Sequence, residues 1–192
     1  MLFRSSPVVP PIPGIERAMT LRTVEDVERI FNCVAQKPAN AVVIGGGFIG
    51  VEIAENLIHR GINTSIVEAS PQLLAPLDPE MATLVAREMA KNNVELHLGA
   101  SLQEISESTV VLSNGAVLAA EMIILAIGVR PDIKLAREAG LTIGARGGIE
   151  VDEFNRTSNP DIYAVGDVAE KVDALDGSST LVPLANLRSE EH

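Results

Sequence analysis

Six residues, Gly45-Gly46-Gly47-Phe48-Ile49-Gly50, have the G-x-G-x-x-G spacing of a loop that holds phosphates. Gly45 permits a tight turn from strand to helix, Gly47 leaves the backbone bare for a pyrophosphate, and Gly50 lets the helix pack closely on the strand. The unbonded N–H groups at the start of that helix, with its dipole, would hold the negative charge without a lysine. The alternative is a glycine-rich turn that binds no ligand. The chain has no G-x-x-x-x-G-K-[ST] sequence, which excludes a nucleoside-triphosphatase loop.

One carboxylate, that of Glu68, stands where the next predicted strand ends. A carboxylate there accepts hydrogen bonds from the ribose hydroxyls of NAD and repels the 2′-phosphate of NADP. No arginine or lysine between Val67 and Glu80 would compensate that phosphate. The sequence therefore predicts NAD(H) as the ligand, with NADP(H) disfavoured. The alternative is a solvent-exposed glutamate at a strand end.

The elements that would position these groups alternate between strand and helix. The apolar run 41–44 predicts a buried parallel strand, residues 48–60 predict a helix, and 63–67 predict the next strand. Upstream, Thr23 is the predicted N-cap of a helix that ends at Pro38. Its predicted buried stripe consists of Val27, Ile30, Phe31 and Val34.

The following residues complete an α/β pattern. A helix is predicted over 79–91 and a strand over 94–98. The hairpin signal Asn114-Gly115 predicts a small antiparallel meander laid on the parallel sheet, with strands at 102–105, 109–112 and 116–119. A buried strand is predicted over 122–127. Beyond Pro131 we expect a short helix over 134–139 and a strand over 162–165 that leads into Gly166-Asp167.

Composition excludes several classes of partner. The chain has 192 residues, a net charge of −11 and only 3% aromatic residues, which argues against nucleic acid and anionic membranes. No basic patch is evident, so backbone dipoles must hold any phosphate. The single cysteine, Cys33, excludes an intrachain disulfide, and the three histidines lack metal-ligand spacing. No signal peptide and no membrane span are recognisable, so a cytoplasmic protein is expected.

Three segments are similar to motifs of the pyridine nucleotide-disulfide oxidoreductase family. They are Val42–Glu52, Leu125–Pro131 and Ile162–Asp167, and their order and spacing also match. The segments Val8–Gly14 and Leu181–Asn186 resemble the subgroup of coenzyme A-disulfide reductases and NADH oxidases or peroxidases. The expected fold class is α/β, a Rossmann-like three-layer parallel sheet with an antiparallel β-meander (the FAD/NAD(P)-binding fold), plus a remnant of an FAD domain.

The resemblance implies a role for each matching residue. Gly45, Gly47 and Gly50, with the N–H groups of Phe48 and Ile49, would hold the NAD pyrophosphate. The ring of Phe48 would cover the flavin until nicotinamide displaces it; the alternative is a simply packed side chain.

Further along the chain, Glu52 would lie near the nicotinamide end, or else be a solvated helix residue. Gly128 would mark the crossing to the flavin domain. Gly166 and Asp167 would contact the ribityl and phosphate region of FAD, or else form only a turn.

The resemblance also implies the organisation of the chain. Residues 10–131 are expected to form an NAD(H)-binding domain and 132–192 a C-terminal fragment of an FAD-binding domain. The family's first glycine motif, its active-site cysteine and its dimerisation domain are expected outside these residues, with a homodimeric parent. No catalytic residue is expected in the chain, and Cys33 is interpreted as a small hydrophobic residue.

In the parent, NADH would pass hydride to FAD for reduction of a disulfide, a peroxide or oxygen. One alternative is a stand-alone NAD(H)-binding or sensing module. An in-frame FAD motif upstream of Met1 would exclude it. A second alternative, a one-domain dehydrogenase, needs a catalytic pair such as Tyr/Lys, and the only tyrosine is Tyr163 on the FAD side.

Overall fold

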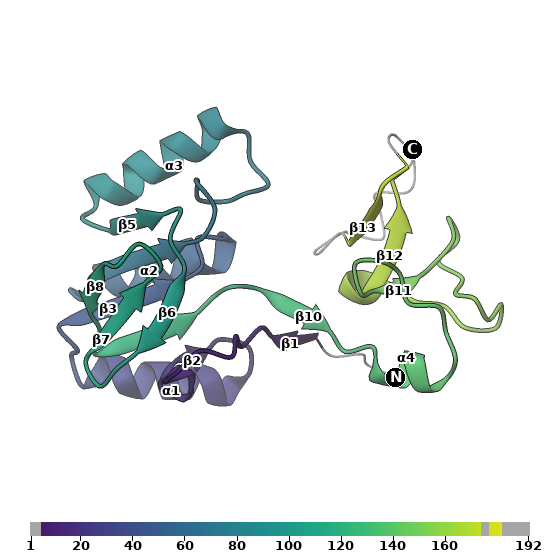
Figure 1. Cartoon of the computed structure of the whole chain (residues 1–192), viewed down its shortest axis with the longest axis horizontal. Coiled ribbons are helices and arrows are strands. Elements are labelled where there is room, and N and C mark those ends of the chain that lie inside the picture. The colour runs from purple at the N-terminus through teal and green to yellow at the C-terminus, as the bar shows by residue number, and fades with distance from the viewer. Residues whose placement is uncertain (1–4, 174–176, 182–192) are drawn as a thin grey trace. The chain divides into compact units, whose positions relative to one another are not determined.

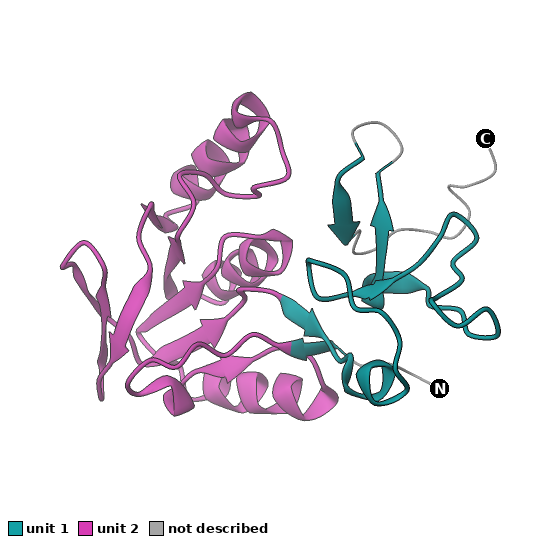
Figure 2. Cartoon of the chain, turned by 45° about the vertical axis from the view of Figure 1, so that its right-hand side comes forward, with its two compact units in different colours: residues 1–6, 129–192 teal, residues 7–128 magenta. Residues whose placement is uncertain are grey.

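The structure is a computed structural model, and it describes residues 5–173 and 177–181 (Figure 1). The chain divides into two compact units, which Figure 2 shows in different colours. Unit 2 consists of Pro7–Gly128, and unit 1 consists of Met1–Ser6 with Val129–His192. Of the segment Leu181–Asn186, which resembles the subgroup named above, only Leu181 is among the described residues.

Unit 2 is built on a five-stranded sheet with the order β2-β9-β3-β4-β5. All neighbouring strands are parallel. The central strands are apolar because both faces of the sheet are covered, and four residues of β3 and all four of β9 are buried. The strands are β2 (Met19–Thr20), β3 (Asn40–Ile44), β4 (Asn63–Glu68), β5 (Glu95–Leu98) and β9 (Met122–Leu125).

Three helices belong to this unit, namely α1 (Val24–Ala35), α2 (Phe48–His59) and α3 (Pro79–Lys91). Their apolar side chains join one core cluster with strand residues such as Val43, Ile66 and Ile124. Helix α2 buries Gly50, Ile53, Ala54 and Leu57 at helical spacing. These bounds confirm the expected fold class.

Helix α1 differs from expectation in the face it buries. Val27 and Phe31 were predicted to be buried, but they are 51% and 61% exposed, and α1 has no fully buried residue. Only a narrow line of Ile30, Cys33 and Val34 packs on the core. Burial raises the pKa of the Cys33 thiol, which packs on this core.

The N-terminus of α1 is fixed by a capping box. The Thr23 hydroxyl accepts a hydrogen bond from the Asp26 N–H at 3.3 Å, and the Asp26 carboxylate accepts from the Thr23 N–H at 3.1 Å. We expect Thr23→Ala to lower the free energy of unfolding of unit 2 by about 1 kcal/mol in urea denaturation. Thr23→Ser keeps the acceptor oxygen and should recover most of the loss. Equal losses in the two variants would contradict this role.

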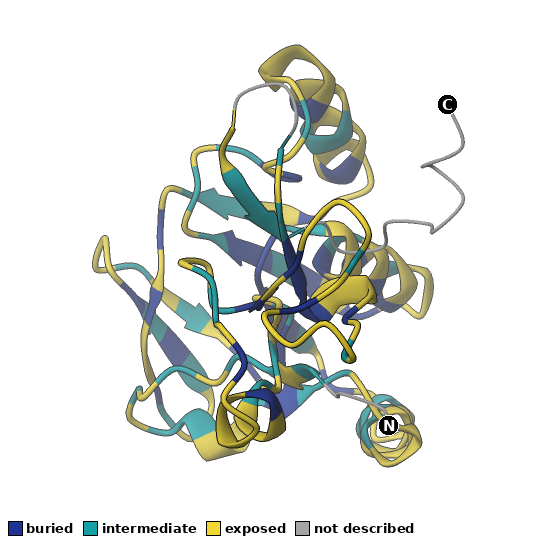
Figure 3. Ribbon diagram, turned by 90° about the vertical axis from the view of Figure 1, so that its right-hand side faces the viewer, coloured by how far each residue is buried: buried dark blue, intermediate teal, exposed yellow. Residues whose placement is uncertain are grey.

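A second core cluster lies under the meander of β6 (Leu102–Ile105), β7 (Thr109–Leu112) and β8 (Val117–Ala119). The meander is antiparallel, and its inward residues, such as Val110 and Leu112, contact the parallel sheet. Buried residues are dark blue on these strands in Figure 3. The hairpin predicted at Asn114-Gly115 is present, with Gly115 in the left-handed region at φ +83°. The meander prediction is therefore confirmed.

The two ends of unit 2 are joined to each other. The N–H of Val8 donates to the carbonyl of Gly128, the last residue of the unit, at 3.0 Å. Farther in, the turn η1 (Ile15–Arg17) follows Gly14, and the Ile105 N–H donates to the Pro13 carbonyl at 2.9 Å. The proline-rich segment is thus loop-like, as expected, and is bound to the meander.

Unit 1 contains two small sheets. In one, β1 (Ser5–Pro7) pairs with β10 (Val129–Pro131). The other has the order β11-β12-β13, with β11 (Ile149–Glu150), β12 (Ala169–Val172) and β13 (Ser179–Leu181). The unit also contains α4 (Lys134–Glu138) and the 3-10 turn η2 (Gly166–Val168). Its core consists mainly of residues such as Ala136, Ile149 and Ala164.

The strand predicted over 162–165 is wrong. Tyr163 forms only an isolated bridge with Arg156, and no described strand lies beside this segment to extend the ladder. A strand requires a partner backbone for its N–H and C=O groups, and the hydrophobic pattern alone does not supply one. The strand in this region is β12, which starts after η2 and pairs with β11 and β13.

Candidate dinucleotide-binding site

The candidate site lies at the carboxyl ends of β3 and β4. Strand order turns at β3, because β4 and β5 follow on one side of it and β9 and β2 lie on the other. Ligands of open parallel sheets bind at the carboxyl ends of the strands at such a point. The residues 45–50 leave the end of β3 and enter α2, and Glu68 ends β4.

Two glycines of the bend are required by the protein itself. Gly45 has φ +111°, and a Cβ on it would lie 2.5 Å from the Ala126 carbonyl oxygen. Its N–H donates to the Val67 carbonyl at 2.8 Å, which ties the bend to β4. A Cβ on Gly50 would collide with the carbonyl oxygen of Gly45. These contacts match the roles predicted for the two residues in turning and in helix packing.

Gly47 is different, because nothing in the protein requires it to be glycine. Its φ of −76° suits any residue, and a Cβ placed on it meets no atom within 4 Å. Within the described residues, the N–H groups of Gly47, Phe48 and Ile49 donate to no acceptor. Three successive amides without a protein acceptor therefore lie at the positive end of α2.

The Glu68 side chain faces the bend. Its Oε2 accepts from the Gly46 N–H and its Oε1 from the Ser70 N–H, both at 2.7 Å. Burial raises the pKa of the Glu68 carboxyl, but the N–H groups of Ser70, Gly46 and Ala69 and the Ser70 hydroxyl lower it more, so the net pKa is lowered. Glu68 is thus a half-buried carboxylate rather than a solvated strand-end residue.

Other predicted site residues of unit 2 are exposed. Phe48 is 58% and Ile49 47% exposed, so the alternative that Phe48 is simply packed does not hold in this unit. Glu52 is exposed one turn into α2. Gly128 has φ +96° and ends the unit. Gly166 and Asp167 belong to η2 of unit 1, so the predicted residues come from both units.

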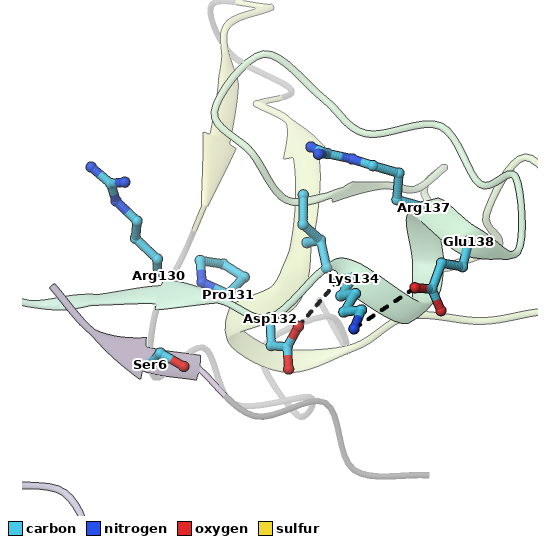
Figure 4. A pocket seen from close by; sticks show the side chains of 8 residues that line it. Ser6, Arg130, Pro131, Asp132, Lys134, Arg137 and Glu138 are labelled. Atoms are coloured by element: carbon cyan, nitrogen blue, oxygen red, sulfur yellow. Dashed lines mark hydrogen bonds and ion pairs between the residues drawn. The ribbon is translucent and has the colours of Figure 1, made fainter.

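One pocket of unit 1 gathers charged side chains of both signs (Figure 4). Arg130, Lys134 and Arg137 line it together with Asp132 and Glu138. The sequence does not reveal this pocket, because positive and negative residues are interspersed between Arg130 and Glu138 and become neighbours in space only where the chain turns into α4. The Lys134 ammonium lies 4.0 Å from the Glu138 carboxylate, and the Asp132 carboxylate accepts from the Lys134 N–H at 3.1 Å. The pocket is therefore of mixed charge.

Within residues 5–173 and 177–181, no helix is long and apolar enough to span a bilayer. No cluster of three histidine, cysteine or acidic side chains there has the arrangement of a metal site.

Comparison with known proteins identifies the family. The family model described as pyridine nucleotide-disulphide oxidoreductase matches residues 5–186. An NADH oxidase of Methanocaldococcus jannaschii is 38% identical over 186 residues, which are 93% of this chain and 41% of that protein.

Solved structures agree with this result. The reduced CoADR-RHD of Bacillus anthracis superposes with a TM-score of 0.88 at 46% identity, over 94% of this chain and 33% of that one. The water-forming NADH oxidase of Lactobacillus brevis, bound to NADH, has a TM-score of 0.84 at 27% identity, over 94% of this chain and 41% of that one. The chain thus spans less than half the length of these relatives. It belongs to the pyridine nucleotide-disulphide oxidoreductase family.

Proposed function

We propose that this chain is the NAD(H)-binding part of an FAD-dependent oxidoreductase, with unit 2 as the binding domain and unit 1 as part of the FAD domain. The observation that carries the proposal is the open space at Gly47 beside three unbonded amides. A glycine that the protein does not need for its own packing is explained by a ligand that approaches the backbone there. Phosphate oxygens fit this arrangement because they accept from several N–H groups at once.

The preference for NADH over NADPH is supported by Glu68. Its lowered pKa keeps it ionised at neutral pH, and it would repel a 2′-phosphate. The L. brevis relative is bound to NADH and is named a water-forming NADH oxidase. By analogy, hydride from NADH would reduce FAD in the longer protein, for reduction of a disulfide, a peroxide or oxygen.

The residues of this chain bind and orient, while the cofactors supply the redox chemistry. The amides of Gly47, Phe48 and Ile49 would hold the pyrophosphate, and Glu68 would hold the adenosine ribose. Exposed Phe48 and Glu52 would face the nicotinamide end, Gly128 the passage to the flavin domain, and Gly166 with Asp167 the FAD. A homodimeric, cytoplasmic parent remains a prediction from the sequence.

The test is Gly47→Ala in this chain. Because the new methyl group meets no protein atom, we expect the free energy of unfolding to change by less than about 1 kcal/mol. We expect NADH affinity to fall roughly tenfold or more, since the methyl group occupies the space proposed for the pyrophosphate. Calorimetric titration of both proteins with NADH and with NADPH gives the result. Equal NADH affinity in both proteins would contradict the proposed site, and tighter NADPH binding by the unaltered chain would reverse the preference.

A further inference from the structure

Gly46, the middle glycine of the bend, is enclosed by the segment that follows β4. Its N–H donates to Glu68 Oε2 at 2.7 Å, and its carbonyl accepts from the Leu74 N–H at 2.8 Å. A Cβ on Gly46 would lie 2.5 Å from Leu73 Cδ2 and 3.1 Å from Glu68 Cβ. Both polar groups of this residue are therefore used by the segment 68–74.

The same segment is tied to β5. The Ala100 N–H donates to the Glu68 carbonyl at 3.1 Å, and the Gly99 N–H donates to the Ser70 carbonyl at 2.9 Å. Leu73 is fully buried, and Leu74 has a left-handed backbone at φ +49°. Segment 68–74 is thus held in place by the residues that follow β5, and the hydrogen bond from Gly46 to Glu68 attaches the bend to this segment.

The Glu68 carboxylate is well supplied with donors. Two ionised oxygens offer about four acceptor sites. The shortest hydrogen bonds come from the N–H groups of Gly46 and Ser70, and the Ala69 N–H and the Ser70 hydroxyl also stabilise the ionised form. A ribose hydroxyl bound here would take the place of one of the two weaker donors, and the bond to Gly46 would stay.

We propose that Glu68 is a positioning residue for the phosphate-binding bend, in addition to its contact with ribose under the proposed function. The free amides of Gly47, Phe48 and Ile49 follow Gly46 directly. Glu68 holds the peptide before Gly46, and the Leu74 N–H holds the peptide between Gly46 and Gly47, so removing the carboxylate frees one of the two peptides that set where these amides point. Loss of Glu68 therefore weakens NADH binding through the bend as well as through the ribose.

The experiment compares Glu68→Ala and Glu68→Gln with Glu55→Gln, an exposed glutamate of α2. Amide hydrogen exchange at Gly46 and Ser70 is measured by NMR, and affinities for NADH and NADPH by calorimetry. In Glu68→Ala we expect Gly46 to exchange roughly tenfold faster or more and NADH affinity to fall by a similar factor. Glu68→Gln keeps one acceptor oxygen and should give intermediate values, whereas Glu55→Gln should match the unaltered chain.

One result would overturn the inference, namely unchanged Gly46 exchange in Glu68→Ala together with lost NADH affinity, which would confine Glu68 to the ribose. If the unaltered chain binds neither nucleotide, the proposed function fails, but the exchange rates still decide the inference.

A titration of the unaltered chain avoids any folding defect of the variants. As pH falls through the lowered pKa of Glu68, the amide signals of Gly46 and Ser70 should shift with a common midpoint. Independent midpoints would also overturn the inference.

Discussion

Replacing Glu170 by alanine is expected to lower the free energy of unfolding of unit 1 by about 3–5 kcal/mol. The side chain is 1% exposed. Its carboxylate accepts from the N–H groups of Arg146 and Gly148, each at 2.9 Å, and from the Ser179 hydroxyl. Alanine would leave three donors without their acceptor, and the Gly148 N–H among them is buried.

The surrounding chain has no room to adapt. A Cβ on Gly148 would lie 2.9 Å from the Glu170 Cβ, and a Cβ on Gly144 would collide with the Glu170 carboxylate. The turn 144–148 therefore wraps around this carboxylate, while Ser179 attaches β13 to it. Loss of the carboxylate loosens the turn and the three-stranded sheet together.

The measurement uses the single tyrosine. The chain has no tryptophan, and Tyr163 lies in unit 1, so tyrosine fluorescence in urea reports the unfolding of that unit. Glu150→Gln is the matched control, since Glu150 is exposed and pairs in register with Glu170. A similar urea midpoint for Glu170→Ala and Glu150→Gln would show that the buried network contributes little.

The stability of unit 1 should also depend on pH. Burial raises the pKa of Glu170, but the Ser179 hydroxyl, the N–H groups of Arg146 and Gly148 and the Arg146 charge outweigh it, so the net pKa is lowered. Because the unfolded state binds the proton more readily, the stabilisation is present above the unfolded pKa and is lost as pH falls through the folded one. Glu170→Gln should flatten this acid dependence, and an unchanged slope would contradict the assignment.

Gly45→Ala is expected to have the second largest effect, in unit 2. Alanine at φ +111° is strained, and its methyl group would lie 2.5 Å from the backbone oxygen of Ala126. Neither backbone can yield, because the Ala126 N–H donates to the Ile44 carbonyl at 2.7 Å. We expect a loss of about 2–4 kcal/mol in the free energy of unfolding, together with loss of NADH binding.

Gly47→Ala is the matched variant, two residues away in the same bend. It should keep the fold and lose only the affinity for the cofactor. Circular dichroism in urea measures the stability of both variants, and calorimetry measures their binding. Equal free energies of unfolding for Gly45→Ala and Gly47→Ala would contradict the prediction, because they would show that the bend moves away from the Ala126 carbonyl without cost.

The features that the sequence predicted correctly depend on local chemistry. The capping pair Thr23 and Asp26, the hairpin at Asn114-Gly115 and the glycine spacing of the bend each act over a few residues. Their geometry follows from residue type and spacing, with little contribution from the rest of the chain.

The features that it missed depend on distant neighbours. Val27 and Phe31 are exposed because α1 meets the core along one narrow line, which the periodicity of the helix does not reveal. The segment 162–165 has no partner strand in the described structure. The hydrogen bond between Glu68 and Gly46 forms only because the carboxyl ends of β3 and β4 lie side by side in the sheet. The glycine bend and the helix that follows it were therefore predictable, whereas the hydrogen bonds of Glu68 and Glu170 were not.

The hydrogen bond between Val8 and Gly128 has a consequence for how this protein can be rearranged. Unit 2 is one uninterrupted stretch, inserted into a host unit that resumes at Val129. Because the two ends of unit 2 meet, unit 2 can be excised and the two parts of unit 1 joined by a short peptide. The ends of unit 2 can also be fused to each other and new termini opened in one of its surface loops, as in a circular permutation. Gene fusion could thus carry such a module into unrelated hosts without reshaping either.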